Sequence, residues 1–258
     1  MSQKSKDIAI VIPARLNSRR LKNKVLIKFN GLEMIEHVRR RAVLNSHKLP
    51  VLVLSNDKPI LNLIDKYGGN SFKTTKIHTS GLSRVFEAAS DLPYDKYLIL
   101  QGDEILIQPS EIDKLIVNIK NLSFVATNCV SRIKNNMEIS NPNIVKCTIT
   151  MNKKISGIYR KSPLIGDYSK QIKLLRKING MFAFNKQKIT IIPSALNSSL
   201  IKNQSIEQLY FIENGIPLEY LEIDQDYPSV NTLSDYKKCL RILNTDSIQK
   251  KLLRKING

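Results

Sequence analysis

The chain has 258 residues, of which 42% are hydrophobic and 24% are charged, a composition typical of a soluble globular protein. No apolar run approaches the roughly 20 residues that span a bilayer, and the first residues are mostly polar and charged, so we expect neither membrane insertion nor a signal peptide. The three cysteines are far apart and form no CxxC pair, which argues against a zinc site or a disulfide framework and favours a cytoplasmic location. A formal net charge of +19 allows nucleic acid, an anionic membrane surface or anionic small molecules as partners. Because the lysines are spread along the chain and tryptophan is absent, this charge alone does not decide the function.

The first predicted element is an apolar run at 8–12, IAIVI, which is short and β-branched enough to be a strand buried on both faces. Pro13 cannot donate a hydrogen bond to a neighbouring strand, so we expect it to end this one. The loop at 14–24 contains no acid and five cations, Arg15, Arg19, Arg20, Lys22 and Lys24. A basic loop at the carboxyl end of a buried strand is where open α/β sheets bind ligands, and its charge suits a polyphosphate. A solvated basic loop in a basic protein is the alternative that charge alone leaves open.

Strand and helix patterns alternate through the first half of the chain. We expect helices at 34–45, 59–67, 80–89 and 109–121. We expect strands at 50–54, 71–73, 97–100 and 124–130. Asn30-Gly31 predicts a turn before the first of these helices. Strands that alternate with helices of about ten residues imply βαβ units and a mostly parallel sheet, which is an α/β fold.

The pattern changes at residues 131–180, which we interpret as an antiparallel insertion that forms a lid or a dimer surface. Two strands at 144–150 and 155–159 are predicted to pair around a turn, and 160–171 is predicted to be a loop. The remaining predicted elements are strands at 178–184 and 218–223 and helices at 205–214 and 232–243. Residues 246–258 are expected to be a basic C-terminal tail. The tail contains a second copy of the octapeptide KLLRKING, whose first copy occupies 173–180.

Asp103 is the acidic residue most clearly placed for chemistry. The sequence contains neither a GxGxxG nor a GxxxxGK[ST] motif, and its three histidines show no metal-ligand spacing. Asp103 follows the strand predicted at 97–100, so its carboxylate should lie at the sheet edge that carries the basic loop. A carboxylate that faces a polyphosphate needs a Mg²⁺ ion between the two. An acid that pairs with arginines of the loop is the alternative.

Six short sequence blocks occur in order and at fitting distances along the chain. They are PARLNSRRLKNK at 13–24, HTSGLSR at 78–84, QGDE at 101–104, NPNIVK at 141–146, SIEQL at 205–209 and SVNTLSDY at 229–236. Together they resemble the blocks of CMP-Kdo synthetases, the 3-deoxy-manno-octulosonate cytidylyltransferases, over residues 8–243. The first block and QGDE are fairly specific for sugar nucleotidyltransferases, and HxSGxxR with NPNxVK narrows the resemblance to this branch.

The resemblance implies a Rossmann-like fold of the nucleotidyltransferase type, with a mostly parallel sheet, a smaller antiparallel insertion and a single domain at 1–245. It implies transfer of CMP from CTP to a sugar acid, Kdo or a related ulosonate, with release of pyrophosphate, for cell-surface polysaccharide (lipopolysaccharide) synthesis. It also implies Mg²⁺ as the cofactor and a homodimer, with no nucleic acid as a partner. In such chemistry a hydroxyl attacks the α-phosphorus in line, and cations offset the charge that develops on the phosphoryl oxygens.

The resemblance also assigns roles to individual residues. The nucleotide would be bound by Ala14, Arg15, Ser18, Arg20, Lys24, Ser80 and Arg84. The catalytic residues would be Arg15, Lys24 and Asp103. The sugar acid would face Gln101, Glu207 and Gln208, and Mg²⁺ would be held by Asp103 and Asn231.

Several positions depart from the family pattern. Asn231 stands where the family has a metal-binding aspartate, so the site loses one negative charge, for which Asp224 or Asp226 would compensate. In the sugar half, the family's arginine, histidine, tyrosine and two glutamates correspond to Thr75, Lys177, Met181, Ile201 and Gln204. These departures leave a different sugar, or a non-catalytic nucleotide- or sugar-binding relative, as alternative functions. A nucleic-acid-binding protein is a third alternative that depends on the net charge alone.

Overall fold

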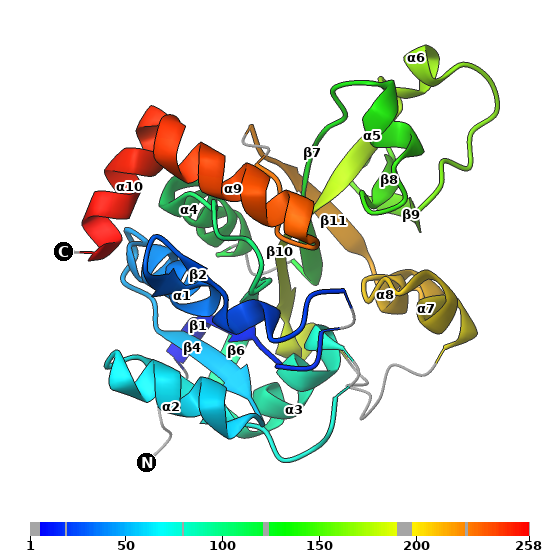
Figure 1. The fold of residues 1–258 in the computed structure, drawn as a ribbon. Helices are drawn as coiled ribbons and strands as arrows, with labels where there is room; N and C mark the ends of the chain where they lie inside the picture. Colours follow the sequence, from blue (N-terminus) through cyan, green and yellow to red (C-terminus); the bar gives the residue numbers. More distant parts are fainter. Residues whose placement is uncertain are drawn as a thin grey trace.

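The computed structural model describes residues 6–18, 20–78, 80–120, 124–189, 198–224 and 227–257. Its centre is a sheet in which seven strands follow the order β11-β7-β10-β6-β1-β4-β5 (Figure 1). These strands are β1 (Lys6–Pro13), β4 (Val51–Ser55), β5 (Asn70–Lys73), β6 (Tyr94–Leu100), β7 (Ala126–Arg132), β10 (Leu175–Asn185) and β11 (Leu218–Glu222). β1 pairs in parallel with β4 and β6, β4 with β5, and β11 with β7, whereas β10 is antiparallel to β6 and β7. The prediction of an α/β fold with a mostly parallel sheet is therefore confirmed.

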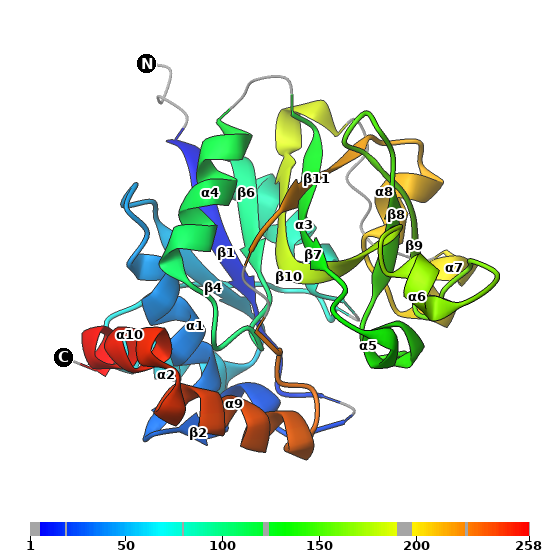
Figure 2. The same ribbon diagram turned by 90° about the horizontal axis from the view of Figure 1, so that it is seen from above.

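Two hydrophobic clusters, one on each face of the sheet, explain why its strands are apolar throughout. In β1, Ile8, Ile10 and Ile12 belong to one cluster and Ala9 and Val11 to the other, because successive strand side chains point to opposite faces. The first cluster is covered by α1 (Met34–Val43), α2 (Lys58–Lys66), α4 (Pro109–Ile119) and α9 (Leu233–Thr245). The second is covered by α3 (Gly81–Asp91), α7 (Ser199–Gln204) and α8 (Leu209–Glu213) (Figure 2). Within the described ranges, none of the helices is long and apolar enough to cross a membrane.

The insertion after β7 adds two strands to the sheet, and the first of them pairs with β10. It consists of α5 (Asn136–Ser140), β8 (Lys146–Ile149), β9 (Ile155–Tyr159) and α6 (Tyr168–Gln171). β8 is antiparallel to both β10 and β9, so the predicted strand pair is confirmed. A small core of its own contains Ile133, Ile139 and Leu175. The loop predicted at 160–171 is wrong for its last 4 residues, where the Asp167 side chain caps α6 by accepting from the Ser169 N–H.

Some elements were not predicted by the periodicity of the sequence. β2 (Lys28–Phe29) and β3 (Leu32–Glu33) form a separate hairpin around the predicted turn at Asn30-Gly31, where φ is 48° and 88°. The helix predicted at 205–214 is shorter, because Ser205 has a φ of 51° and separates α8 from the unpredicted α7. Two 3-10 helices are η1 (Lys24–Leu26) and η2 (Lys186–Lys188).

The segment expected to be a basic tail contains the helix α10 (Ser247–Asn257), which packs against α9 and α1 (Figure 1). The Asp246 side chain accepts from two backbone N–H groups at the start of this helix. The buried Gln249 side chain donates to the Leu106 carbonyl at 2.8 Å. The C-terminal helix is therefore anchored to the loop that follows β6.

Candidate active site

The basic loop and the segment 101–104 meet at the carboxyl edge of the sheet, as predicted. β1 and β6 are parallel neighbours, so the segments that follow them leave the sheet at the same edge. Figure 1 shows the dark-blue loop after β1 beside the start of α9. Three segments that are distant in the sequence therefore border the site.

Lys24 and Asp103 form an ion pair at this edge. Lys24 Nζ lies 2.6 Å from Asp103 Oδ2 and donates to the Val230 carbonyl at 2.9 Å. The Val230 N–H in turn donates to the Asp103 carbonyl at 3.1 Å. The two charged side chains are 14% and 19% exposed, so the pair is mostly shielded from water. Asp103 thus pairs with a cation of the loop, and this cation is a lysine.

Arg20 connects the insertion to the segment before α9. Its Nη1 donates to Asn143 Oδ1 at 3.0 Å, and its Nη2 donates to Asn231 Oδ1 at 2.6 Å. The Asn231 amide group donates to Ser229 Oγ at 3.1 Å. The oxygen is the only side-chain atom of an asparagine that ligates Mg²⁺. In this structure that oxygen accepts a hydrogen bond from a guanidinium.

Asp103 and Asn231 are the residues expected to hold Mg²⁺. The Asp103 carboxylate fits this role, because it lies at the ligand-binding edge and provides the charged oxygen that Mg²⁺ prefers. Asn231 adds a neutral oxygen, and both residues are now engaged by cations of the loop. In the described residues, no three histidine, cysteine, aspartate or glutamate side chains are grouped around a metal position. The residues present therefore fit a metal that binds together with the phosphates of a nucleotide.

Asp224, one of the two acids considered as substitutes for the family's aspartate, is engaged elsewhere. The Asp224 side chain is 93% exposed and pairs with Lys114 of α4 at 3.0 Å. Asp226 lies outside the described residues. Asp103 therefore remains the acid that is predicted to hold the metal.

The N-terminus of α3 forms a second part of the site. Ser80 caps the helix by accepting from the Ser83 N–H at 3.1 Å. The Glu207 carboxylate accepts from the Gly81 and Leu82 N–H groups at 2.8 and 2.6 Å. Burial raises the pKa of Glu207, and these two N–H groups and Arg15 oppose the rise. Glu207, expected to face the sugar acid, is therefore bound to the start of α3.

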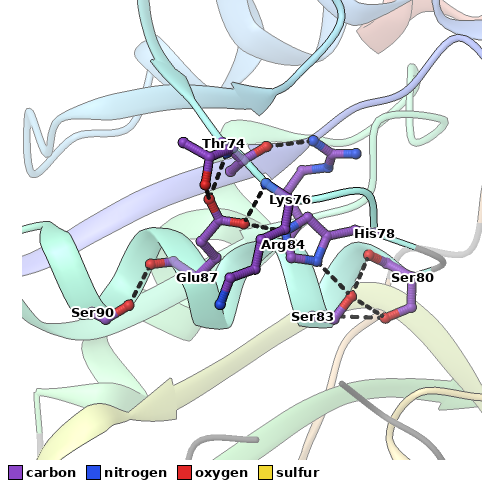
Figure 3. Close-up of polar contacts among 9 residues, drawn as sticks. Thr74, Lys76, His78, Ser80, Ser83, Arg84, Glu87 and Ser90 are labelled. Atoms are coloured by element: carbon purple, nitrogen blue, oxygen red, sulfur yellow. Dashed lines mark hydrogen bonds and ion pairs between the residues drawn. The ribbon is translucent and has the colours of Figure 1, made fainter. Parts of the chain in front are cut away.

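A polar network between α3 and the segment that leads into it fixes that segment (Figure 3). Glu87 accepts from the Thr75 N–H at 2.6 Å, the Thr75 hydroxyl at 2.8 Å and the Lys76 N–H at 3.3 Å. His78 contacts Glu87 through Nε2 and Ser83 Oγ through Nδ1. Burial alone would raise the pKa of Glu87, but these hydrogen bonds lower it to about 2. Sequence reasoning missed this network, although Ser83 and Glu87 are four residues apart on one helix face.

Arg84 and Arg15 lie near each other beside Asp57. Arg84 is buried and donates to the Thr74 hydroxyl at 2.6 Å. Its pKa is lowered by burial and by the charge of Arg15, and it is raised by Asp57. Arg15 itself is exposed. The structure thus brings together two of the cations that were predicted to bind the nucleotide.

Backbone hydrogen bonds fix the start of the basic loop. The Ala14 N–H donates to the Leu54 carbonyl at 2.9 Å, and the Ser18 N–H donates to the Leu16 carbonyl at 2.9 Å. The Leu16 N–H donates to Asp57 Oδ2 at 2.8 Å. Asp57 was not predicted as a site residue, although its position before the Lys-Pro start of α2 is typical of an N-cap.

The structure brings the residues that were expected to face the sugar acid only partly together. Gln101 is half-buried, and its N–H donates to the Gly180 carbonyl at 2.9 Å. Gln208 Nε2 donates at 3.1 Å to Oδ1 of Asn128, a buried residue that sequence reasoning missed. The Asn128 amide can be recognised as a partner of Gln208 only when the position of β7 in the sheet is known.

The positions that depart from the family pattern lie in different surroundings. Lys177 is buried and pairs with Glu138 of α5 at 2.9 Å. Met181 and Ile201 are buried in the hydrophobic clusters on opposite faces of the sheet. Thr75 belongs to the Glu87 network. Lys177 and Thr75, which replace family residues, therefore each have a polar partner within this chain.

Comparison with known proteins agrees with this arrangement. A family model described as cytidylyltransferase matches residues 9–223. The 3-deoxy-manno-octulosonate cytidylyltransferase of Chlorobium limicola is 31% identical, with 91% of this chain and 96% of the relative covered. The enzyme of that name from Thermodesulfovibrio yellowstonii is 32% identical, with 92% and 98% covered. A solved structure of a CMP:2-keto-3-deoxy-manno-octonic acid synthetase complexed with CTP covers 93% of this chain and 100% of its own, with 26% identity and a TM-score of 0.84. The chain belongs to the 3-deoxy-manno-octulosonate cytidylyltransferase family.

Proposed function

We propose that this protein transfers CMP from CTP to 3-deoxy-manno-octulosonate or a closely related sugar acid and releases pyrophosphate. The observation that carries the proposal is the pairing of Lys24 with Asp103 at the carboxyl edge of the sheet. Lys24 belongs to the loop 14–24, which contains five cations and no acid, and Asp103 belongs to the segment that follows β6. A cationic loop beside a carboxylate that can hold a metal is the arrangement that a metal-bound triphosphate needs. Membership of the family supports the same reaction.

The residues of the loop act on the triphosphate. Arg15, Arg20 and Lys24 bind its phosphate oxygens and offset the charge that develops when the acceptor hydroxyl attacks the α-phosphorus. Asp103, with the Asn231 oxygen, would hold Mg²⁺, which supplies Lewis-acid stabilisation of the phosphoryl oxygens. Ser80 and Arg84 orient the nucleotide from the start of α3. Ala14 and Ser18 contribute backbone groups of the loop that Asp57 fixes.

Binding of the nucleotide exchanges partners in this site. Lys24 donates to Asp103 and Arg20 donates to Asn231 before the phosphates arrive. A triphosphate offers both cations stronger, charged acceptors. The exchange releases an oxygen of Asp103 and the oxygen of Asn231 for the metal. The protein therefore keeps Lys24 and Arg20 hydrogen-bonded until the substrate replaces their partners.

The location and assembly follow from the same proposal. A protein that uses CTP to activate a sugar acid for cell-surface polysaccharide belongs in the cytoplasm, and we propose that it works there as a homodimer. Size-exclusion chromatography with light scattering gives the mass of the assembly directly. A monomer at micromolar concentration would contradict the dimer.

Pyrophosphate release tests the reaction. The rate is measured with CTP and with UTP in the presence of Mg²⁺, over a panel of sugar acids and matched neutral sugars. We expect release with CTP and an ulosonate and little with a neutral sugar. The second candidate function, a non-catalytic nucleotide-binding relative, is favoured by the neutral Asn231 and its bond to Arg20. CTP binding without any turnover across the panel identifies that function.

A further inference from the structure

A small cavity lies where the start of α4, the segment after β6 and the middle of β10 meet. Its volume is about 20 Å³, and a single buried water molecule needs about 10–15 Å³. The cavity therefore has room for one water molecule or one ion without its hydration shell. The apolar part of its wall includes Leu106, Met181 and Ile223, which belong to the first hydrophobic cluster.

The polar part of the wall presents oxygen atoms. Glu104, Glu111 and Asn179 line the cavity, together with Tyr227, whose hydroxyl donates to Asp246 at 3.1 Å. Glu111 is 5% exposed, and its buried Oε2 has no hydrogen-bond partner in the part of the chain that the structure describes. The same is true of the buried Oδ1 of Asn179. Buried acceptors without a donor are costly, so these two oxygens indicate a bound species in the cavity.

An irregular section of β10 shapes this wall. Residues 178–182 of β10 lie opposite residues 128–130 of β7, so β10 carries extra residues here. Such a bulge changes the direction of side chains, and Asn179 and Gly180 lie within it. A β-carbon at position 180 would overlap the Glu104 carboxylate. The glycine therefore leaves the room that Glu104 occupies beside the cavity.

The cavity also collects negative charge. Two carboxylates that line so small a space repel each other unless a cation or a proton lies between them. Lys114 contacts Glu111 Oε1 at 3.2 Å, but its side chain is 43% exposed and also contacts Asp224 at 3.0 Å. Lys114 thus reaches the outer oxygen of Glu111, and the inner oxygen Oε2 faces the cavity. This arrangement favours a cation inside the cavity over a neutral water molecule.

The size and the ligands of the cavity select the kind of cation. Mg²⁺ usually keeps several of its water molecules, and Ca²⁺ takes about 6–8 oxygen ligands. A space for one particle beside two carboxylates and an amide satisfies neither ion. A singly charged ion gives up its water more readily, because its charge is lower. Among the common monovalent ions, K⁺ is close in size to a water molecule.

We propose that this cavity binds one K⁺ ion through Glu111 Oε2, Asn179 Oδ1 and the Glu104 carboxylate. The position differs from that of the candidate Mg²⁺ site, where the Asp103 carboxylate pairs with Lys24. Since Glu104 follows Asp103 directly, the ion fixes the segment that carries the candidate metal ligand. The ion binds whether or not the chain transfers CMP.

Thermal unfolding in three chloride salts tests this site. The wild-type protein is compared in KCl, NaCl and choline chloride at equal ionic strength, without Mg²⁺ or nucleotide, since choline is too large for the cavity. KCl should raise the unfolding temperature by about 3 °C or more relative to choline chloride, because an ion that binds only the folded chain stabilises it. NaCl should have a smaller effect. Equal unfolding temperatures in KCl and choline chloride would overturn the proposal and leave a water molecule or a shared proton in the cavity.

Glu111→Gln keeps the shape of the side chain and removes its charge. The difference between KCl and choline chloride should disappear in this variant. Glu213→Gln, at an exposed glutamate of α8, is the matched control and should keep the full difference. A purely structural role of Glu111 would lower stability by the same amount in every salt and preserve the difference. A preserved difference in Glu111→Gln therefore contradicts the site.

Anomalous diffraction locates the ion without any variant. Tl⁺ resembles K⁺ in size and charge and scatters anomalously, so wild-type crystals soaked in thallium acetate should show a peak between Glu104, Glu111 and Asn179. Crystals that show Tl⁺ elsewhere and none in this cavity would overturn the proposal.

Discussion

The two sides of the candidate site hold their positive charges in different ways. On the nucleotide side, Lys24 pairs with the Asp103 carboxylate at 2.6 Å. On the insertion side, Arg160 and Lys146 donate to backbone carbonyls, and these carbonyls are neutral. The first side contains a charge of each sign, whereas the second has an excess of positive charge.

This difference in charge predicts how variants on each side respond to Mg²⁺ and CTP. A paired lysine and aspartate can separate when a magnesium–triphosphate complex brings both a cation and an anion to the site. Guanidinium and ammonium groups on neutral oxygens have no protein charge to release, so only an anion neutralises them. Variants on the first side should therefore change the response to Mg²⁺ and CTP. Variants on the second should leave that response unchanged.

Removing the Asp103 carboxylate is expected to have the largest effect. Asp103→Asn should lower the rate of pyrophosphate release by about 10³-fold or more, because a metal ligand contributes several kcal/mol to stabilisation of the transition state. Thermal unfolding should occur near the wild-type temperature. Asp91→Asn, at an exposed acid at the end of α3, is the control. A variant at 103 that keeps most of its activity would place the metal elsewhere.

Arg15→Ala tests whether the cations of the first side recognise phosphate. Loss of a charge-assisted hydrogen bond should weaken CTP binding by roughly 1.5–3 kcal/mol, and calorimetry with Mg²⁺ measures this change. The affinity for the acceptor should remain as in the wild-type protein. Unchanged CTP affinity would contradict the assignment of the loop.

Glu87→Gln tests the network that positions α3 on the first side. The folded-state pKa of Glu87 is about 2, below its ordinary value of 4.5, so its carboxylate stabilises the fold above about pH 4.5. This contribution is lost as the pH falls from 4.5 towards 2. The variant should lose roughly 2 kcal/mol of unfolding free energy at neutral pH and show a weaker dependence on acid. Denaturant unfolding at several pH values measures both effects, with the exposed Glu213→Gln as control. Parallel pH profiles of the variant and the wild type would disprove the role of Glu87.

Asn231→Asp has the smallest expected effect and compares the two sides directly. A carboxylate next to Asp103 should lower the Mg²⁺ concentration for half-maximal rate by a few fold, because it adds a charged ligand. Asn143→Asp is the matched control, since Asn143 is the other partner of Arg20 and belongs to the insertion. The control should leave the Mg²⁺ response unchanged. An equal shift in both variants would show that charge near Arg20, and not a metal ligand, is responsible.

Much of the nucleotide side could be predicted from the sequence, because its signals are local. The run at 8–12, the loop that follows it and Asp103 all lie next to buried strands whose parallel order fixes their common edge. Asp57 and Glu87 were missed, because their partners lie 41 and 12 residues away and no local pattern marks the contacts. The cations of the insertion were missed because their partners are backbone carbonyls of other segments.

The repeated octapeptide KLLRKING shows that local sequence alone does not determine secondary structure. The copy at 173–180 contributes to β10, where the alternate residues Leu175 and Lys177 are buried between neighbouring strands. The copy at 251–258 contributes to α10, which packs on α1 and α9 and in which Ile256 is buried. Identical residues therefore form a strand or a helix according to the surfaces on which they pack.

The central claim is that this site joins CMP to a sugar acid. Phosphorus NMR of a reaction with CTP, Mg²⁺ and 3-deoxy-manno-octulosonate tests it most directly, with Asp103→Asn as the inactive control. The account predicts that the triphosphate signals disappear while pyrophosphate and one new phosphodiester signal appear in equal amounts, and that neither product forms with the control. Unchanged CTP in the wild-type reaction, or release of CMP without the phosphodiester, would contradict the claim.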